Sequence, residues 1–446
     1  MNLPVLAMFV LISVCSVAGQ DFTSKAAEYM NAQVGLNHFH GSVLVAKDGK
    51  VLLSRSYGLV NADSNEASVS NNEYRLGPIS KGFTAAAILQ LEEKGKLKLE
   101  DSICEYIPNC PADWQQITLF NLLIQTDGIP EVSSSFGAGT ARSAKTFPEL
   151  LAYLSKLPLE FKPGQKVKNG DSGYALLQAV IEKASGEPYS EYLRNHIFIP
   201  LNMKDTGYDD AMRADHGRVT SHNQEPGETG AALHVPPVAF LSPNDRLYST
   251  VEDLYLWDRE LYGGKTVSKR SIDEMFKPYV DGYAFGWAIR REFDRVVDTQ
   301  AAGLHVLSSS FRRYPSENSC VIVLSNEDDV DAEKISHDLA AILFGGHYEL
   351  PVRHHRVALD PKTYDSYVGQ YELTPDSVLT VTREGNGLAI QGIGPSAIEI
   401  LPESETRFFA AGLGSEINFV KGNDGNTVEL ILQQGGRDIP VVKVKQ

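Results

Sequence analysis

The chain has 446 residues, of which 42% are hydrophobic and 22% are charged, and its formal net charge is −16. This length is typical of two or three folded domains, and the composition is that of an ordinary folded protein. A strongly acidic chain without a basic run is a poor ligand for phosphate-rich surfaces. Nucleic acids and anionic membranes are therefore excluded as expected partners.

The first 19 residues, MNLPVLAMFVLISVCSVAG, contain no charged side chain and have a short apolar centre followed by small residues. This pattern predicts a cleaved secretory signal peptide over residues 1–19, and the alternative is a buried N-terminal helix. No other stretch approaches the length of apolar sequence that a membrane span requires. We expect a mature protein that starts at Gln20 and is secreted or periplasmic.

The region after the leader predicts one α+β domain over residues 20–346. Alternating residues around Asp48 and Gly49 indicate a β-hairpin between His40 and Asn61. Helical patterns follow from Lys81 to about Leu261, strands return over 282–293 and around Cys320, and a helix is expected over 331–344. Strands at both ends with helices between them predict a sheet that joins the two chain ends.

A helix of about four turns is predicted from Pro78 to Gly95. Proline is well tolerated at the first helical position, because its missing N–H would be unpaired there. Ser80 is the nearest hydroxyl, but two residues of helix rotate it roughly 200° from the face that carries residue 78.

Three cysteines remain after the leader. Cys104 and Cys110 flank a short loop and could form a disulfide in an oxidising compartment, or could be two separate buried thiols. Cys320 lies in an apolar run that reads as a buried strand, which favours a packed free thiol. Their spacing resembles no metal site.

The character of the chain changes near residue 347. Residues 359–446 show short alternating strands separated by turns, which predicts a small all-β, barrel-like domain. Residues 347–358 form the linker. It contains His347, His354 and His355, but no surrounding carboxylate or cysteine pattern, so a solvated linker is favoured over a metal site.

Local matches along the chain resemble the serine β-lactamase-like hydrolases, a group that includes class C β-lactamases, penicillin-binding D-alanyl peptidases and related esterases. The matches include GSVLVAKDGKVLLSRSYGLVN, LEEKGKLKLEDSICEYIP, LLIQTDGIPE and GDSGYALLQAVIEKASGEPY, and they extend from about Gly41 to Phe344. The tail, with YVGQYEL and LTVTREG, looks like the lipocalin-like β-domain often fused behind such hydrolases.

The resemblance implies three catalytic elements. The first is a Ser-x-x-Lys pair, which here reads Pro78-Ile79-Ser80-Lys81, so the nucleophile is absent and only the lysine remains. The second, usually Tyr-x-Asn, reads Asn169-Gly170-Asp171. It lacks the phenol, and it offers a carboxylate that could pair with Lys81 and keep it protonated.

The third element is usually a Lys- or His-led triplet, and it falls on Gln300-Ala301-Ala302 with Gly303 next. His305, five residues beyond the expected place, is the nearest imidazole. Gln125 stands where the family usually has His. The candidate cleft residues are therefore Lys81, Asp171, Gly303 and His305, and no cofactor or metal is expected.

Loss of nucleophile, phenol and basic triplet together favours a pseudoenzyme that binds a small ligand or a protein partner. One alternative is an active esterase or D-alanyl peptidase-like hydrolase in which Ser80, Thr84 or another residue has become the nucleophile. Another is an interaction protein that works through its β-domain, although the aromatic residues Tyr367, Tyr371, Phe408 and Phe409 are expected to be core.

Overall fold

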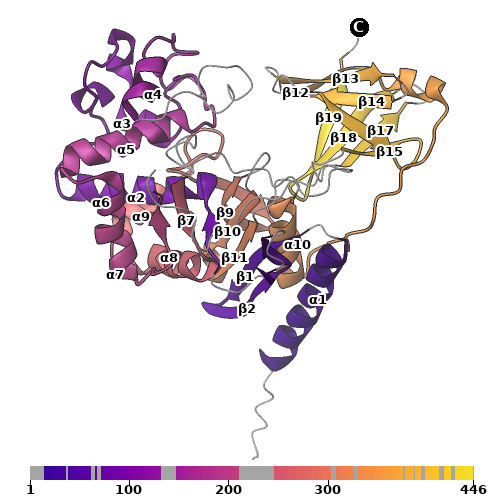
Figure 1. The fold of residues 1–446 in the computed structure, drawn as a ribbon, viewed down its shortest axis with the longest axis horizontal. Helices are drawn as coiled ribbons and strands as arrows, with labels where there is room; N and C mark the ends of the chain where they lie inside the picture. Colours follow the sequence, from indigo (N-terminus) through magenta and orange to yellow (C-terminus); the bar gives the residue numbers. More distant parts are fainter. Residues whose placement is uncertain are drawn as a thin grey trace, which may run out of the picture.

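The computed structural model describes residues 15–36, 39–61, 66–67, 72–131, 147–209, 246–302, 308–325, 330–374, 377–385, 387–392, 397–410, 416–422 and 427–444. Figure 1 shows a body of helices and sheet, and beside it a separate β-barrel reached through an extended segment. Within these ranges no helix has both the length and the apolar character needed to cross a bilayer.

The body is built on an antiparallel sheet with the strand order β2-β1-β11-β10-β9-β8. The strands are β1 (Gly41–Lys47), β2 (Lys50–Tyr57), β8 (Ala288–Glu292), β9 (Arg295–Ala302), β10 (Ser308–Tyr314) and β11 (Ser319–Ser325). Val43 of β1 faces both Arg55 and Val323, so the predicted hairpin pairs directly with a strand from the far end of the domain. The predicted joining of both chain ends in one sheet is confirmed.

One strand is shorter than the sequence suggested. The expected strand over 282–293 begins only at Ala288. Gly282 and Gly286 adopt φ angles of +76° and +78°, which residues with a Cβ rarely adopt. The apolar residues before Ala288 therefore form a turn, and Ala284, Phe285 and Trp287 are buried there without belonging to a strand.

Both faces of the sheet are covered, because successive side chains along each strand point to opposite faces and both sets are apolar. Val43 and Val323 point toward α1 (Cys15–Gly35) and α10 (Ala332–Phe344), whereas Leu44 and Ile322 point toward the larger helical core. That larger core contains α2 (Ser80–Glu93) and α8 (Val251–Gly263). The helix expected over 331–344 is confirmed, with the Asp331 side chain capping its N-terminus.

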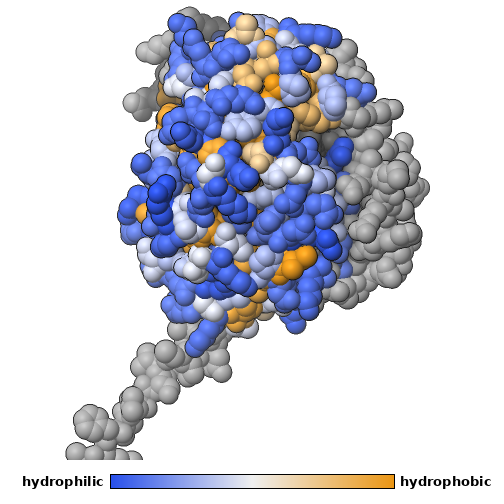
Figure 2. Space-filling model, turned by 90° about the vertical axis from the view of Figure 1, so that its left-hand side faces the viewer, coloured by the Kyte–Doolittle hydropathy of each residue, from blue (hydrophilic) through white to orange (hydrophobic). Residues whose placement is uncertain are grey.

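The remaining helices form the outer part of the body. They are α3 (Leu119–Leu123), α4 (Phe147–Leu154), α5 (Ser172–Ser185), α6 (Tyr189–Leu193), a π-helical turn (Arg194–Phe198), α7 (Ile199–Leu201) and α9 (Lys269–Met275). Short strands β3 (Leu59–Asn61) and β4 (Glu66–Ala67) pair, as do β5 (Tyr74–Arg75), β6 (Gly207–Tyr208) and β7 (Leu247–Ser249). Figure 2 shows the side of the molecule that lies at the left of Figure 1. Its surface is mostly hydrophilic, with hydrophobic residues gathered near the top.

Strand β10 carries two adjacent buried arginines that point to opposite faces of the sheet. Arg313 donates to Asp258 at 2.7 Å and to Asp298 at 3.1 Å on the α8 side. Arg312 donates to Ser336 of α10 at 2.7 Å and pairs with Glu292 of β8 on the other side. Since each guanidinium is only about 1% exposed, each needs these carboxylates to offset its desolvation.

The second domain is a closed antiparallel barrel in which each strand from β12 to β19 pairs with the next and β12 pairs with β19. Its strands are β12 (Gly369–Thr374), β13 (Ser377–Glu384), β14 (Gly387–Gln391), β15 (Ile398–Pro402), β16 (Arg407–Ala410), β17 (Glu416–Lys421), β18 (Thr427–Gln434) and β19 (Arg437–Lys443). Tyr367, Tyr371 and Phe408 are fully buried among its core residues, as expected. The barrel interior is therefore filled by side chains.

The segment between the domains is only partly solvated. His347 is 87% exposed, as a solvated linker predicts. His354 differs, because its ring stacks on Phe409 at 4.6 Å and its Nδ1 lies 2.7 Å from Glu403. Phe409 accordingly lies outside the barrel core, against the linker. Within the described ranges, no group of three or more His, Cys, Asp or Glu side chains is arranged to hold a metal ion.

We expect Asp258→Asn to destabilise the body by about 3–5 kcal/mol, because it removes a carboxylate from a buried arginine. Asp273→Asn is the matched control. Asp273 forms an exposed ion pair with Lys269, which lies one helical turn earlier in α9. We expect its replacement to lower the stability by at most about 0.5 kcal/mol. Urea denaturation measures both changes. Equal effects of the two substitutions would contradict the assigned role of Asp258.

Candidate functional site

Pro78 lies in a short 3-10 turn, Gly77–Ile79, that leads directly into α2. The turn satisfies the local hydrogen bonding without an N–H from residue 78, which explains why proline fits there. Its side chain lines a cavity of about 240 Å³ between the helical part and the sheet. The position that the resemblance assigns to a nucleophile therefore faces a cleft but carries no oxygen.

Lys81 is the second residue of α2, three residues after Pro78, and it is only 4% exposed. Its Nζ donates to the main-chain oxygen of Gly170 at 2.9 Å and to Asn169 Oδ1 at 3.3 Å. It also lies 3.1 Å from Asp171 Oδ1, which forms the ion pair that the sequence suggested. The ammonium group thus contacts the second element through one ion pair and two hydrogen bonds.

The segment 169–171 is itself held in place by two residues from another loop. Gln125 Oε1 accepts from the Gly170 N–H at 2.9 Å, and Glu131 accepts from the Asp171 N–H at 2.5 Å. A Cβ on Gly170 would lie 2.0 Å from Glu131 Oε2, so a side chain there would displace the Glu131 carboxylate. The sequence singled out Gln125 only by resemblance, and it gave no role to Glu131.

Gln300 lies on β9 just beyond the last pair with β8, Ala288 with Thr299. Its Nε2 donates to the Gly286 oxygen at 2.7 Å, which fixes the orientation of the amide. A Cβ on Gly82 of α2 would lie 3.0 Å from that nitrogen, so the amide packs directly against the helix. The position that the resemblance assigns to a Lys- or His-led triplet therefore carries a neutral amide that lines the cleft. Gly303 and His305 lie outside the described residues.

The cavity brings together Pro78, Lys81, Asn169 and Gln300 from three distant parts of the chain. It also includes residues that the sequence did not point to, namely Tyr283, Trp287, Arg290, Glu292, Thr299, Glu333 and Arg437. Arg437 comes from the barrel, which the sequence treated as a separate domain. The doublet Gly435-Gly436 before it was visible as a turn, but nothing in the sequence indicated where that turn docks.

The alternative hydroxyl groups are sealed away from the cleft. The Ser80 side chain is fully buried, and its Oγ makes no hydrogen bond to the described part of the chain. Thr84 is buried and lies 2.8 Å from the Tyr189 hydroxyl. Tyr174 donates to the Leu123 oxygen at 2.7 Å, so it does not replace the missing phenol.

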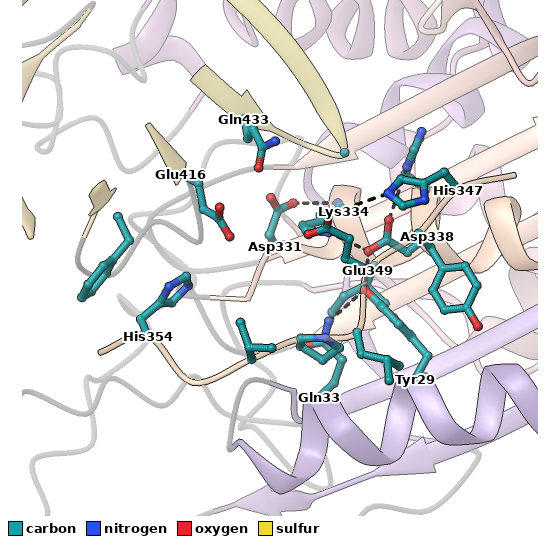
Figure 3. Close-up of a pocket in the computed structure, with 18 of the residues that line it drawn as sticks. Tyr29, Gln33, Asp331, Lys334, Asp338, His347, Glu349, His354, Glu416 and Gln433 are labelled. Carbon is teal, nitrogen blue, oxygen red and sulfur yellow. Dashed lines mark hydrogen bonds and ion pairs between the residues drawn. The ribbon is translucent and has the colours of Figure 1, made fainter. Parts of the chain in front are cut away.

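A larger cavity of about 640 Å³ lies between the body and the barrel (Figure 3). Its walls come from α1, α10, the linker and the barrel. Many of its polar groups already bind one another: Gln33 donates to Tyr29, Tyr29 to Asp338, and Lys334 to Asp338. Arg407 likewise pairs with Glu416. This interdomain pocket is large, but many of its charged side chains already pair with one another.

One carboxyl group close to the site has a strongly altered pKa. Burial raises the pKa of Asp127 to about 7, although the Ile129 N–H, 2.8 Å from its Oδ1, favours the charged form. A Cβ on Gly173 at the start of α5 would lie 2.9 Å from its other oxygen. Asp127 therefore lies against the helix that follows Asp171.

A lysine in the first turn of a buried helix, a facing polar segment and a sheet strand surround one cleft, as in a β-lactamase or penicillin-binding-protein type of hydrolase fold. Comparison with known proteins agrees. The family model "Beta-lactamase" matches residues 29–344, and the chain belongs to this family. The family described as "Domain of unknown function (DUF3471)" matches residues 353–442, which cover most of the barrel.

Individual relatives support the same assignment. "Penicillin-binding protein 4*" of Bacillus subtilis (strain 168) is 31% identical over 437 residues, 92% of this chain and 96% of that protein. The octameric penicillin-binding protein homologue from Pyrococcus abyssi has a TM-score of 0.67 at 22% identity, covering 94% of this chain and 100% of its own. The D-amino acid amidase from Ochrobactrum anthropi SV3 has a TM-score of 0.59 at 17% identity, covering 69% and 91%. These two structures share the fold.

We expect Asp171→Asn to cost about 3 kcal/mol of stability, because it leaves the buried ammonium of Lys81 without a carboxylate. In a Lys81→Met background the same substitution should cost clearly less, since no charge then needs a partner. Urea denaturation of the four proteins measures the coupling. Equal costs in both backgrounds would show that the ion pair does not stabilise the site.

The raised pKa of Asp127 gives a pH prediction. Between about pH 4 and pH 7 the folded chain keeps a proton that the unfolded chain has lost, so this group's contribution to stability falls as pH rises through that window. The free energy of unfolding of Asp127→Asn, compared with that of wild type, should therefore rise by about 2 kcal/mol from pH 5 to pH 8. Denaturant unfolding at both pH values tests this, with the exposed Asp113→Asn as control. A parallel pH dependence of wild type and Asp127→Asn would contradict it.

Proposed function

We propose that this chain is an exported, catalytically inactive member of the family that binds a ligand in its cleft without acyl transfer. The observation that carries the proposal is Pro78 at the nucleophile position, with Lys81 one turn later held by Asp171. Proline offers no atom that can form an acyl intermediate. The Lys81 ammonium is already engaged in an ion pair with Asp171 and in hydrogen bonds to Asn169 and Gly170.

The sealed hydroxyl groups support the same proposal. Ser80 and Thr84, the nearest candidates for a relocated nucleophile, are both buried, and Thr84 is hydrogen-bonded to Tyr189. Thr299 lines the cleft, but its hydroxyl donates to the Ala288 oxygen at 3.1 Å. Each of these three hydroxyl groups is therefore buried or already hydrogen-bonded.

Export is proposed on two grounds. The first is the apolar leader expected over residues 1–19, although residues 1–14 lie outside the description and α1 runs across the expected cleavage point. The second is the disulfide between Cys104 and Cys110, whose Cα atoms are 5.2 Å apart. Such bonds persist in oxidising compartments.

Intact-mass measurement tests the proposal directly. The purified mature chain is exposed to a fluorophosphonate and, separately, to benzylpenicillin. We expect no mass increase from a sample whose folding is verified by circular dichroism. A stoichiometric adduct that maps to one hydroxyl would overturn the proposal and identify a relocated nucleophile, as in an active esterase or D-alanyl peptidase.

Pro78→Ser is the matched variant. It restores the hydroxyl but leaves Lys81 paired with Asp171 and Gln300 in place of a cation. We expect ester hydrolysis by this variant to stay at background, because the catalytic unit loses most of its rate when any member is missing. Measurable turnover would show that the rest of the site is still competent.

A further inference from the structure

The barrel side of the interdomain pocket is formed by one row of side chains. Phe409 of β16 lies opposite Glu416 of β17. Gln433 of β18 lies opposite Glu416 on one side and opposite Asp438 of β19 on the other. Directly opposite residues of antiparallel strands share a face, with Cβ atoms about 5 Å apart. All four line the pocket, so this row points out of the barrel, whereas the neighbouring Phe408 lies in the barrel core.

The body side of the pocket is formed by the start of α10. Asp331 caps this helix, and Lys334 and Asp338 follow at spacings of three and four residues, which places the three side chains along one face. The Gly435 N–H at the tip of the barrel hairpin donates to Asp331 Oδ2 at 3.4 Å. Figure 3 shows Gln433 and Asp331 on facing sides of the pocket. The barrel row therefore lies across the pocket from α10.

The pocket presents unused hydrogen-bond acceptors on both walls. Gln33 of α1 is only 6% exposed, and its Nε2 donates to the Tyr29 hydroxyl at 2.9 Å. Among the described residues no donor reaches its Oε1, although this side chain lines the pocket. Within the same ranges the Gln433 amide makes no hydrogen bond. Because nearly buried acceptors are normally satisfied, these oxygen atoms indicate a ligand that donates hydrogen bonds.

Two carboxylates of the pocket form no ion pair in the part of the chain that the structure describes. They are Asp331, which accepts from main-chain N–H groups, and Asp438. Lys334 and Arg407 already pair with other acidic neighbours, and the exposed Arg353 of the linker offsets at most one of the two carboxylates. Burial raises the pKa of the Asp331 carboxyl group, and a cation beside it would favour the charged form. The pocket therefore has an excess of negative charge.

The linker and the barrel add apolar surface to the same pocket. Leu350 and Val352 of the linker line it and are 41% and 58% exposed, so the protein itself leaves them largely uncovered. Phe409 also lines it, with the His354 ring stacked on it at 4.6 Å. An apolar group that covers these side chains would remove apolar surface from water. A ligand for this pocket therefore combines a hydrogen-bond-donating cation with an apolar part.

We propose that the interdomain pocket binds a small organic ammonium ion that carries an apolar body. An ammonium group donates several charge-assisted hydrogen bonds, and it offsets the unmatched carboxylates of the two walls. A cavity of about 640 Å³ has the size of small-molecule sites, which often lie between domains. No described residue lines both this pocket and the cleft, so the proposed site is separate from the cleft.

The test compares 4-phenylbutylammonium chloride with 4-phenylbutan-1-ol, in which a hydroxyl group replaces the ammonium group on the same apolar body. Saturation-transfer NMR titrations of the full mature chain at about pH 7, where the amine is charged, give both affinities. We expect the cation to bind wild type at least about tenfold more tightly than the alcohol. Equal affinities, or no saturable binding of the cation, would overturn the proposal.

The variants Asp331→Asn and Asp438→Asn remove the two unmatched charges, one from each wall. Asparagine at residue 331 keeps a side-chain oxygen that can cap α10, so the start of the helix is preserved. The double variant should lose most of the preference for the cation, whereas its affinity for the alcohol should stay the same. If the double variant keeps the wild-type preference, the assignment of these carboxylates is wrong.

Two controls locate the binding site. Asp365→Asn removes an exposed barrel carboxylate that pairs with Arg383 and does not line the pocket. Arg290→Ala alters the cleft and leaves the lining of the interdomain pocket unchanged. Both variants should keep the full preference for the cation. Loss of the preference in Arg290→Ala would place the cation in the cleft and overturn the proposal.

Limited digestion with trypsin gives a second readout, because Arg353 and Arg356 lie exposed in the linker. A cation that contacts both walls should slow cleavage at these residues at least about threefold, whereas the alcohol should not. Equal cleavage rates with saturating cation and without ligand would rule out a site between the domains.

Discussion

The site depends on one constraint, the burial of the Lys81 charge. An ammonium group that is 4% exposed must be met by oxygen atoms, and among the described residues these come from the segment 169–171. That requirement ties α2 to the N-terminus of α5, and it explains why Gln125 and Glu131 hold the segment from the opposite side. Lys81 and Asp171 thus connect the two helices through an ion pair. Replacement of either residue removes that pair from the site.

A second buried cation extends the same logic across the domain boundary. Arg312 contacts β8 through Glu292 and α10 through Ser336 and Glu333, and Glu333 in turn meets Arg437 of the barrel. Because α10 receives the Gly435-Gly436 turn at the same place, the barrel is positioned by the sheet core of the body. The two domains therefore meet beside the cleft.

Much of this architecture could be predicted from the sequence. Alternation gave the hairpin at Asp48-Gly49, and the helix after Pro78 and the barrel strands also followed from local patterns. The positions of Lys81, Asn169 and Gln300 in one cleft came from resemblance, since no local rule connects them. The sequence could not assign Arg290, Glu333 and Arg437 to the cleft, because local periodicity does not indicate which distant segments pack together. The strand over 282–293 was overestimated because its apolar residues pack in a glycine turn, and His354 was assigned to solvent because its contacts, Phe409 and Glu403, lie far along the chain.

The cysteines give the fold an intrinsic reporter. Cys104 and Cys110 are bonded to each other, and Cys15 falls within the expected leader. Cys320 is fully buried in β11, and burial raises the pKa of its thiol well above its usual range, which suppresses the reactive thiolate. Of the three cysteines that follow the expected leader, none presents a reactive thiolate in the native state. Opening of the central sheet would expose Cys320 to a thiol reagent or allow a covalent dimer that a non-reducing gel detects. Labelling of this residue therefore measures how fast the protein unfolds during storage.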